Sequence, residues 1–432
     1  MKIIIDGINF EKQKGTGIKT YSSSVIKALS DQNAYLELLS EQNIPNIEHV
    51  NPADAYLAHC LSTGKVNTRG VKAKLIALGK SLLTLKSLKK VELLDDSISK
   101  KNFYRLGSQD WCFIKRIVLS PSIFIKSFYK SALGLSIKKI SLKDSQASIF
   151  FQTSPIPLLI QGKKTITTVH DIIPISHPWL LDSNWRLTSK AFINGMKAIT
   201  EKSDKIICIS NYTKSELINR LSVNPAKLHV IYQPCKYSTT AITSLINDAT
   251  EKNTLGKFDL SPQNYILFNG AIEPKKNLIN LLRAIEIKKD LPTLVIIGGF
   301  AWAYNEERAL INELKDKVKY LGFLPEIELA ILQKNAKCFV FPSIIEGFGL
   351  PVLEAMWFGT PCIVSDIPVF REIFAEHATY CDPYSVESIS NQIQSVCSTQ
   401  QSEESSRKLI NFVQSKYTHQ NFSRELWNVV YN

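Results

Sequence analysis

The stretch from Lys337 to Asp366 constrains the fold of this chain more than any other part of its sequence. Its first residues, Cys338 to Phe341, form a short apolar run that is typical of a buried β-strand and ends at a proline. A loop with two glycines follows. Residues 351–358 then predict a helix with proline in its first turn and a glycine just past its end. Residues 361–365 predict a second strand, so the unit is β-loop-α-β, as in a parallel sheet covered by helices.

The start of this helix predicts a binding site for an anion, because its unpaired N–H groups and its dipole both favour negative charge. Two carboxylates flank that site, Glu346 in the loop and Glu354 about one turn into the helix. An ionised carboxylate only accepts hydrogen bonds, so a phosphate bound beside them should bring hydroxyl groups with it. A ligand that carries phosphates together with several hydroxyls has the chemistry of a sugar nucleotide. The simpler interpretation is that Glu354 complements the helix dipole and Glu346 is a loop charge.

Glu346 and Glu354, separated by seven residues around Gly-Phe-Gly-Leu-Pro, resemble the motif of GT-B glycosyltransferases of the large retaining family 4. The resemblance implies an α/β protein with two Rossmann-like parallel-sheet domains that face each other across a cleft. It also implies that Glu346 holds hydroxyls of the donor sugar at the reaction centre and that Glu354 accepts hydrogen bonds from ribose. The N–H groups of Phe348, Gly349 and Leu350 are expected to face the sugar and the phosphate.

A histidine follows a predicted strand in the first half of the chain. Residues 165–170 predict that strand, which places His170 at its carboxyl end, where ligands of α/β proteins usually bind. A single histidine is more often structural. The segment His-Asp-Ile-Ile-Pro nevertheless resembles the H-D-x-x-P element of the family, which implies that His170 points at the donor sugar beside the reaction centre.

A pair of lysines follows the strand predicted at 265–270, in the segment Gly-Ala-Ile-Glu-Pro-Lys-Lys-Asn. A lysine there could neutralise a diphosphate, although any single lysine is more often simply exposed. The segment resembles the family's G-x-x-x-P-[RK]-K-N element, which implies that Lys276 contacts the donor phosphates. Many relatives have arginine where Ala271 stands, so one phosphate cation is either missing or supplied by another residue.

A glycine loop follows the apolar strand at the start of the chain. Gly15 and Gly17 allow the backbone to turn sharply and to approach a ligand, and an expected helix at 18–29 points its start at the same place. A plain strand-to-helix turn explains this loop as well, since it is not the G-x-G-x-x-G fingerprint. It resembles the opening of family 4 transferases that build bacterial surface polysaccharides.

The chain has 432 residues, which is enough for two or three domains. Hydrophobic residues make up 44% of it and charged residues 21%, which is typical of a globular protein. We predict an acceptor-binding Rossmann-like domain at 1–235, a polar linker at 236–263 and a nucleotide-sugar-binding Rossmann-like domain at 264–415. By the resemblance, residues 416–432 form a helix that crosses back to the first domain.

Residues 71–146 carry most of the positive charge. They hold 14 lysines and 2 arginines against 5 acidic residues, which gives +11 of the net +13 of the whole chain. Basic amphipathic helices of this kind bind anionic membrane surfaces. The alternative is a set of solvated helix faces whose lysine stems cover the core. Nucleic acid is not expected as a partner, because no recognisable binding motif accompanies the charge.

The chain has no run of 18 apolar residues, and its first apolar segment is too short for a signal peptide. We therefore expect a cytoplasmic protein that associates peripherally with the inner face of the membrane. Its eight cysteines are scattered without a C-x-x-C pair, which argues against a zinc site or a disulfide framework. No D-x-D triplet, the metal-binding mark of the other main transferase fold, occurs, so we predict an enzyme without metal or other cofactor.

The function that these features predict is retaining transfer of a sugar, mannose or rhamnose, from a nucleotide sugar to a lipid-linked oligosaccharide in O-antigen or capsule assembly. Two alternatives lie outside transferase chemistry. One is a sugar-nucleotide epimerase on the same architecture, which would need no acceptor. The other is a catalytically inactive protein that binds membrane or polysaccharide.

Overall fold

The structure is a computed structural model. It describes residues 1–9, 17–40, 90–91, 113–119, 123–132, 137, 139–142, 145–181, 185–239, 241–288, 290–301 and 305–432. Gly15 and most of the basic segment 71–146 lie outside these residues.

The first domain is built on a sheet that has eight strands in the described part of the chain. In spatial order these are β10 (Leu228–Val230), β9 (Lys205–Cys208), β8 (Lys164–Val169), β6 (Ile149–Gln152), β1 (Lys2–Asp6), β2 (Tyr35–Ser40), β4 (Ile114–Leu119) and β3 (Lys90–Val91). All neighbours pair in parallel except β3 with β4. Ile3, Ile4 and Ile5 of β1 are all fully buried, as in a strand of a parallel sheet that has helices on both faces.

The second domain is built on a parallel sheet that has six strands among the described residues. Their order is β13 (Val318–Gly322), β12 (Thr293–Ile297), β11 (Tyr265–Asn269), β14 (Cys338–Phe341), β15 (Cys362–Ser365) and β16 (Thr379–Cys381). β14 and β15 flank α14 (Leu350–Trp357), which confirms the β-loop-α-β unit. β5 (Lys139–Ile140) and β7 (Leu159–Ile160) form a separate two-stranded sheet, which packs against the core of the first domain.

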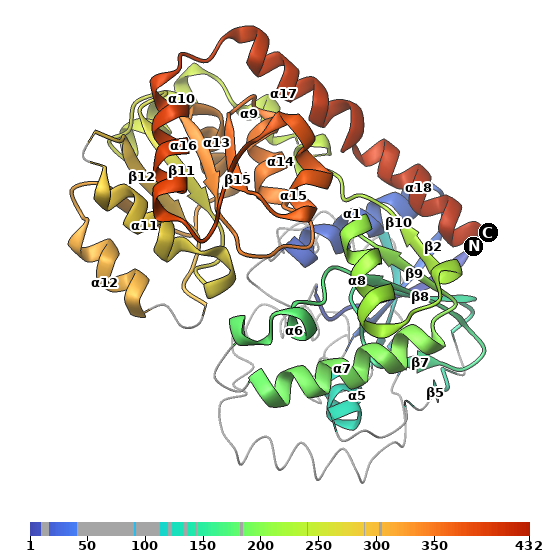
Figure 1. Ribbon diagram of the computed structural model, residues 1–432. Coiled ribbons are helices and arrows are strands. Elements are labelled where there is room, and N and C mark those ends of the chain that lie inside the picture. Colours follow the sequence, from blue (N-terminus) through green and yellow to red (C-terminus); the bar gives the residue numbers. More distant parts are fainter. Residues whose placement is uncertain are drawn as a thin grey trace, which may run out of the picture.

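Helices cover both sheets (Figure 1). The first domain contains α1 (Gly17–Asp31), α5 (Ile123–Ala132), α6 (Ile173–Ser176), α7 (Trp185–Lys202) and α8 (Asn211–Leu221). The second contains α11 (Leu278–Ile287), α12 (Asn305–Glu313), α13 (Glu326–Asn335), α14, α15 (Pro368–Phe374), α16 (Val386–Ser398) and α17 (Glu403–Lys416). Short 3-10 turns are η3 (Pro178–Leu180), η4 (Pro225–Lys227), η5 (Lys236–Ser238), η6 (Pro274–Lys276) and η7 (Ala375–His377). In the described ranges, no helix combines the length and the apolar character needed to cross a membrane.

The segment 236–263 contains more helix than the single short one that its sequence permits. It holds η5, α9 (Ile242–Leu245) and α10 (Asp248–Lys257). Leu255 of α10 is buried in the main core, and Lys257 forms an ion pair with Glu328 of α13. The later part of this segment therefore packs on the second domain.

The C-terminal helices run from the second domain to the first, and the two chain ends lie close together (Figure 1). α18 (His419–Tyr431) packs along α1, where the Ser423 hydroxyl donates a hydrogen bond to the Ala28 carbonyl at 3.2 Å. The ring of Phe422 lies edge-on to Tyr21 of α1, with centroids 5.8 Å apart. A single hydrophobic core therefore continues from one domain into the other.

Each sheet has a point where the strand order reverses, between β11 and β14 in the second domain and between β1 and β6 in the first. Ligands of α/β sheets bind beyond the carboxyl ends of the strands at such points, because the loops there diverge. The loops after β11 and β14 are the two loops that carry Lys276 and Glu346.

Candidate active site

The loop after β14 has a conformation that depends on its glycines. Gly349 precedes α14 with φ 109°, in the left-handed region that favours glycine. A Cβ on Gly347 would collide with the backbone carbonyl of His170. Gly347 therefore allows this loop of the second domain to lie directly against the loop after β8 of the first.

Contacts across the domain boundary hold these two loops together. The Ser210 hydroxyl of the first domain donates to the Gly347 carbonyl of the second at 3.0 Å. Within the first domain, the Thr213 hydroxyl donates to the His170 carbonyl at 3.3 Å and so joins His170 to the same region. Ile345 is buried against Ile173 of the first domain. The structure thus brings His170 and the Glu346 loop, predicted separately from the sequence, to one place.

The His170 side chain is held from two sides. Its Nε2 lies 2.7 Å from the Thr153 carbonyl oxygen, which can only accept, so Nε2 carries the proton. The Tyr21 ring meets the imidazole edge-on at 4.8 Å. Burial lowers the pKa of His170 below its ordinary value, against the raising effects of the Thr153 hydrogen bond and of Asp171. The ring is therefore neutral near pH 7, and among the described residues its Nδ1 contacts no donor.

Lys276 and Glu346 form an ion pair between the two neighbouring loops of the second domain. The Lys276 ammonium also lies 4.8 Å from the centre of the Phe341 ring. Burial raises the pKa of Glu346, but Lys276 and Lys275 outweigh it and hold that pKa below its usual value. Glu346 is therefore ionised although it is only 8% exposed.

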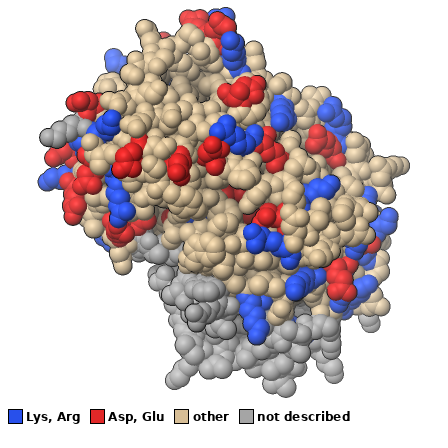
Figure 2. Space-filling view, in the orientation of Figure 1, with Lys and Arg blue, Asp and Glu red and all other residues tan. Residues whose placement is uncertain are grey.

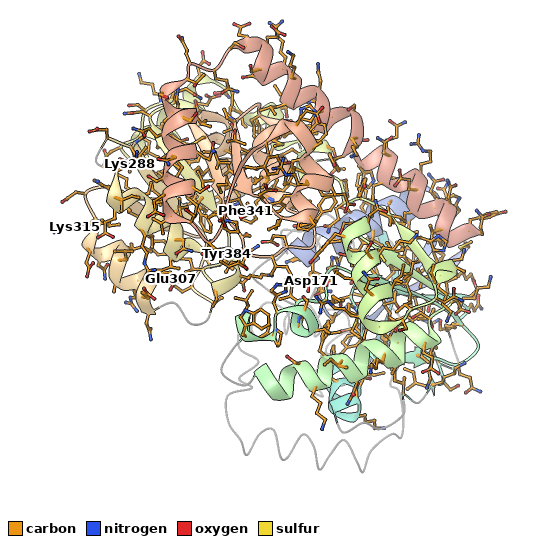
Figure 3. The ribbon with its side chains drawn as sticks, viewed as in Figure 1. Asp171, Lys288, Glu307, Lys315, Phe341 and Tyr384 are labelled. Carbon is orange, nitrogen blue, oxygen red and sulfur yellow. The ribbon has the colours of Figure 1, made fainter. Side chains whose placement is uncertain are left out.

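Lys275 joins the same group of charges. Its ammonium is 3.4 Å from Glu273. Burial alone would lower the pKa of Lys275, but the carboxylates of Glu346, Asp171 and Glu273 raise it above its ordinary value. Asp171 lies on the side of the first domain that faces the second (Figure 3). Lys275 is thus charged, and both lysines of the predicted phosphate loop lie at the domain junction.

The start of α14 offers free donors. The N–H groups of Phe348, Gly349 and Leu350 have no acceptor in the part of the chain that the structure describes, whereas those of Val352 and Leu353 bond to the Gly349 carbonyl. Three such N–H groups at a helix start form a site for an anion. Leu350 also lies beside Gly17, at 3.9 Å from the position of a Cβ there, so the start of α1 approaches the same place.

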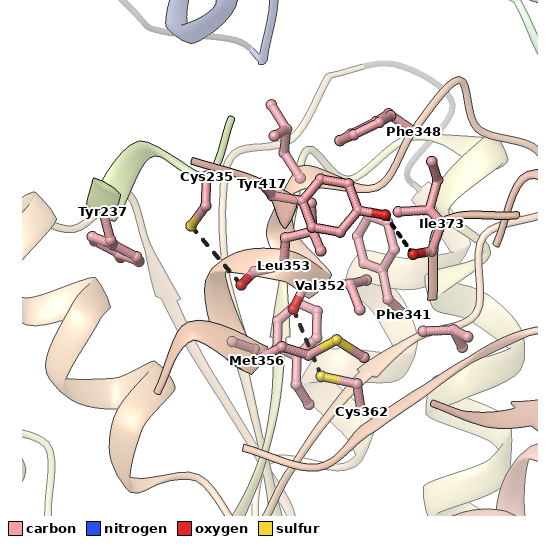
Figure 4. Packing of buried hydrophobic residues seen from close by; sticks show 14 of the residues in the cluster. Cys235, Tyr237, Phe341, Phe348, Val352, Leu353, Met356, Cys362, Ile373 and Tyr417 are labelled. Carbon is pink, nitrogen blue, oxygen red and sulfur yellow. Dashed lines mark hydrogen bonds between the residues drawn. The ribbon is translucent and has the colours of Figure 1, made fainter. Parts of the chain in front are cut away.

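Apolar packing fixes the direction of α14 (Figure 4). The Phe348 ring lies edge-on to Tyr417, whose hydroxyl donates to the Ile373 carbonyl at 2.6 Å. The Cys362 thiol lies 3.8 Å from the Val352 carbonyl oxygen beneath the helix. The free N–H groups therefore have a fixed orientation before any ligand binds.

Glu354 lies deeper along α14 and has protein partners. Its Oε2 is 3.1 Å from the Lys236 ammonium and 3.3 Å from the Gln333 amide nitrogen. Lys236 and Gln333 could not be predicted from the sequence, because both lie far from Glu354 along the chain. Ala271 is exposed, and no arginine replaces it in this loop.

Asn277 is a further residue that sequence reasoning left without a role. It has φ 57°, and its side-chain amide donates to the Pro342 carbonyl at 2.9 Å and to the Pro383 carbonyl at 2.7 Å. Asn277 therefore ties together the loops after β11, β14 and β16. The feature of the sequence that could have pointed to Asn277 is its position directly after the two lysines.

Two facing parallel-sheet domains with this loop geometry define the GT-B class of fold. The solved structure of HepE from Anabaena in complex with UDP-glucose superimposes with a TM-score of 0.63 at 12% identity, covering 100% of this chain and 99% of that chain. WaaG, described as a glycosyltransferase involved in lipopolysaccharide biosynthesis, gives a TM-score of 0.58 at 11% identity, covering 100% of both chains. At such identities the likeness concerns the fold alone.

Sequence comparison specifies the family. Residues 252–415 match the family of glycosyl transferases group 1 and residues 120–235 match glycosyltransferase family 4. These two regions together make up more than half of the chain, which therefore belongs to this family of glycosyltransferases.

Two similar proteins are named for O-antigen synthesis. The O-antigen chain mannosyltransferase RfbU of Salmonella typhimurium is 33% identical over 230 residues, which are 53% of this chain and 58% of that protein. The O-antigen chain mannosyltransferase B of Escherichia coli is 30% identical over 242 residues, which are 54% of this chain and 60% of that protein. The chain thus matches less than two thirds of the length of either relative.

Proposed function

We propose that this protein is a glycosyltransferase that takes a sugar from a nucleotide-sugar donor bound at the start of α14. One observation carries the proposal: the Lys276–Glu346 pair and three free N–H groups lie at the strand-order reversal of the second domain, against His170 of the first. Family membership supports it, as does the solved complex of HepE with UDP-glucose.

In the proposed complex the diphosphate lies over the N–H groups of Phe348, Gly349 and Leu350, with Lys276 as its counter-ion. Lys275 is the residue we assign to the place left by Ala271, since it is charged and lies in the same group of carboxylates. Gly17, and by the family resemblance Gly15, allow the loop of the first domain to approach the donor. Glu354 accepts hydrogen bonds from the ribose.

The chemistry needs stabilisation of the diphosphate as the bond to the anomeric carbon breaks. Each preorganised donor aimed at such charge contributes about 3 kcal/mol. Lys276 and the helix start supply such donors from the chain itself, so we propose that no metal is needed. In this proposal the acceptor attacks from the same face of the sugar from which the diphosphate departs, so the anomeric configuration is retained. Glu346 holds the sugar hydroxyls during this step.

His170 has a defined part in this proposal. Its Nε2–H is used by Thr153, which leaves Nδ1 to accept a hydrogen bond from a sugar hydroxyl. A neutral imidazole at this point orients the sugar without adding positive charge beside the carbon that becomes electron-poor.

The donor sugar is proposed to be mannose, with rhamnose as the second choice, since the two relatives above are named as O-antigen chain mannosyltransferases. The acceptor is proposed to be a lipid-linked oligosaccharide at the inner face of a membrane. The charge of residues 71–146 supports this location. On the face seen in Figure 2, basic and acidic side chains of the described residues are interspersed and form no single patch.

Transfer of labelled sugar tests the proposal. GDP-mannose and dTDP-rhamnose are each incubated with the protein and with lipid extract that contains oligosaccharide acceptors. We expect incorporation into the lipid fraction, release of nucleoside diphosphate that depends on acceptor, and unchanged rates in EDTA. Release without acceptor dependence would contradict transfer, and complete loss of rate in EDTA would contradict the metal-independent mechanism.

A further inference from the structure

The carboxylate of Glu354 is held at one of its two oxygens. Oε2 lies 3.1 Å from the ammonium of Lys236 and 3.3 Å from the amide of Gln333. The Gln333 amide oxygen accepts a hydrogen bond from the Tyr237 hydroxyl at 2.7 Å, which fixes which end of the amide faces Glu354. Oε1 of Glu354 contacts no donor among the residues that the structure describes.

Lys236 reaches Glu354 from outside the second sheet. It is the first residue of η5, in the connection that leaves the last strand of the first domain. Its ammonium also lies 3.8 Å from Glu326 at the start of α13, and its side chain is 15% exposed. Burial alone would lower the pKa of Lys236, but Glu354 and Glu326 raise it above its ordinary value, so the ammonium is charged.

The connection that carries Lys236 is itself fixed. The Cys235 N–H donates to the Tyr417 carbonyl at 2.8 Å, and the Ser238 hydroxyl donates to the Cys235 carbonyl at 2.7 Å. The Cys235 thiol lies 3.9 Å from the Leu353 carbonyl oxygen, next to Glu354 in α14 (Figure 4). Lys236 therefore reaches Glu354 from a backbone that is anchored on both sides.

The physical consequence concerns the direction of Glu354. The last torsion of a glutamate side chain is broad, so an unpaired carboxylate samples many orientations. An ammonium in a nearly buried pair fixes the oxygen that it contacts, because leaving either charge uncompensated there is costly. With Oε2 held, the direction of Oε1 is determined as well.

We propose that Lys236 is a positioning residue for the donor nucleotide: it holds Oε2 of Glu354 so that Oε1 faces the ribose hydroxyls. This inference rests on the proposed function. It adds that the connection between the domains supplies a residue on which recognition of the ribose depends.

Calorimetric titration with nucleoside diphosphates tests this role. GDP and UDP are each compared with their 2′,3′-dideoxy analogues, and dTDP, whose sugar is a 2′-deoxyribose, is compared with the analogue that lacks its remaining 3′-hydroxyl. The pair that binds most tightly is used for the variants. We expect the unaltered protein to prefer the intact ribose by about tenfold or more, as for hydrogen bonds to a charged group. Lys236→Met is expected to reduce this preference to about twofold, whereas Lys236→Arg keeps most of it.

Two further variants sharpen the test. Glu354→Ala should remove the preference, and adding Lys236→Met to it should cause no further loss, because the two residues act through one carboxylate. Lys257→Met breaks a more exposed ion pair to the same helix α13, with Glu328 at 2.7 Å, and should leave the preference unchanged. If Lys236→Met does not fold, Lys236→Gln takes its place with the same expected direction.

The outcomes separate the inference from the proposed function. If none of the three nucleoside diphosphates binds the unaltered protein, the proposed function is wrong. If they bind and Lys236→Met keeps the full preference for intact ribose, only the role of Lys236 is wrong. An equal loss of affinity for both members of a pair would mean that Lys236 contacts the phosphates, which also overturns the positioning role.

Discussion

Glu346 and Glu354 belong to one motif, yet the structure gives them different surroundings. Glu346 pairs with Lys276 at the junction of the two domains, while Glu354 pairs with Lys236 beside α13. At the scale of single residues, this difference supports the two proposed roles, Glu346 at the reacting sugar and Glu354 in nucleotide binding.

Substitution of the two glutamates should therefore affect different kinetic constants. Glu346→Gln is expected to lower kcat by about 100- to 1,000-fold with a small change in donor KM, because it removes charge beside the breaking bond. Glu354→Ala is expected to raise donor KM about tenfold with kcat nearly kept, because it removes a ground-state contact. Steady-state kinetics decides this, and equal small effects from both variants would refute the assignment.

The state of His170 predicts a pH dependence. The pKa of His170 lies below the ordinary histidine value of about 6.5, so the imidazole is neutral at pH 7. It becomes protonated only when the pH falls through this lowered pKa. We expect kcat/KM for the donor to be level from about pH 6.5 upward and to decline in more acidic buffer. His170→Gln should lower the constant value of kcat/KM above about pH 6.5 and remove its decline in acid. His177→Gln should keep both the value and the decline. A decline that persists in His170→Gln would assign it to another group.

At the scale of elements, the site depends on two loops from different domains that meet without space for a side chain. Gly347→Ala would place a Cβ against the His170 carbonyl, so the loops must separate. A displacement of this kind near the reaction centre costs about a hundredfold in kcat/KM.

A matched glycine variant provides the control for this prediction. Gly256 lies in the last turn of α10, and a Cβ there would meet no other atom within 4 Å. Gly256→Ala should keep activity and stabilise the protein by about 0.4–1 kcal/mol, because alanine has less conformational freedom than glycine in the unfolded chain. Activity of Gly347→Ala equal to that of Gly256→Ala would contradict the close contact. Thermal unfolding and donor kinetics measure both variants.

Much of this element-level arrangement could be predicted from sequence. The β14–α14–β15 unit and the strand before His170 have local patterns of apolar residues, glycine and proline, and the structure has them within about two residues of prediction. Site roles for Glu346, Lys276 and His170 came from family resemblance, and the structure brings these residues together. Lys236, Ser210 and Asn277 have partners distant along the chain, and no local pattern encodes such contacts.

At the scale of the whole molecule, a carboxylate of the second domain caps the start of α8 in the first domain. Glu372 of α15 accepts hydrogen bonds from the N–H groups of Asn211 at 2.6 Å and Tyr212 at 2.8 Å, and from the Tyr232 hydroxyl at 3.1 Å. A carboxylate at a helix start satisfies unpaired donors and complements the dipole.

Removing this contact should weaken the junction of the domains. Glu372→Ala is expected to lower the free energy of unfolding by about 1–2 kcal/mol, as for loss of a helix cap. Glu376→Ala, which removes an exposed neighbouring carboxylate 3.6 Å from the His377 ring, should change the free energy of unfolding little. Denaturant titration compares the two variants, and an equal effect from both would show that the Glu372 contact adds no stability.

The central claim is that the start of α14 and Lys276 hold the diphosphate of a sugar nucleotide at the junction of the domains. Calorimetric titration of GDP, UDP and dTDP in EDTA tests it most directly, with Lys276→Ala compared with Lys334→Met, which only breaks a surface pair with Glu251. We predict that at least one nucleotide binds at one site per chain, that Lys276→Ala weakens it tenfold or more, by about 1.4 kcal/mol, and that Lys334→Met does not. Absence of binding by all three, or equal binding by both variants, would contradict the claim.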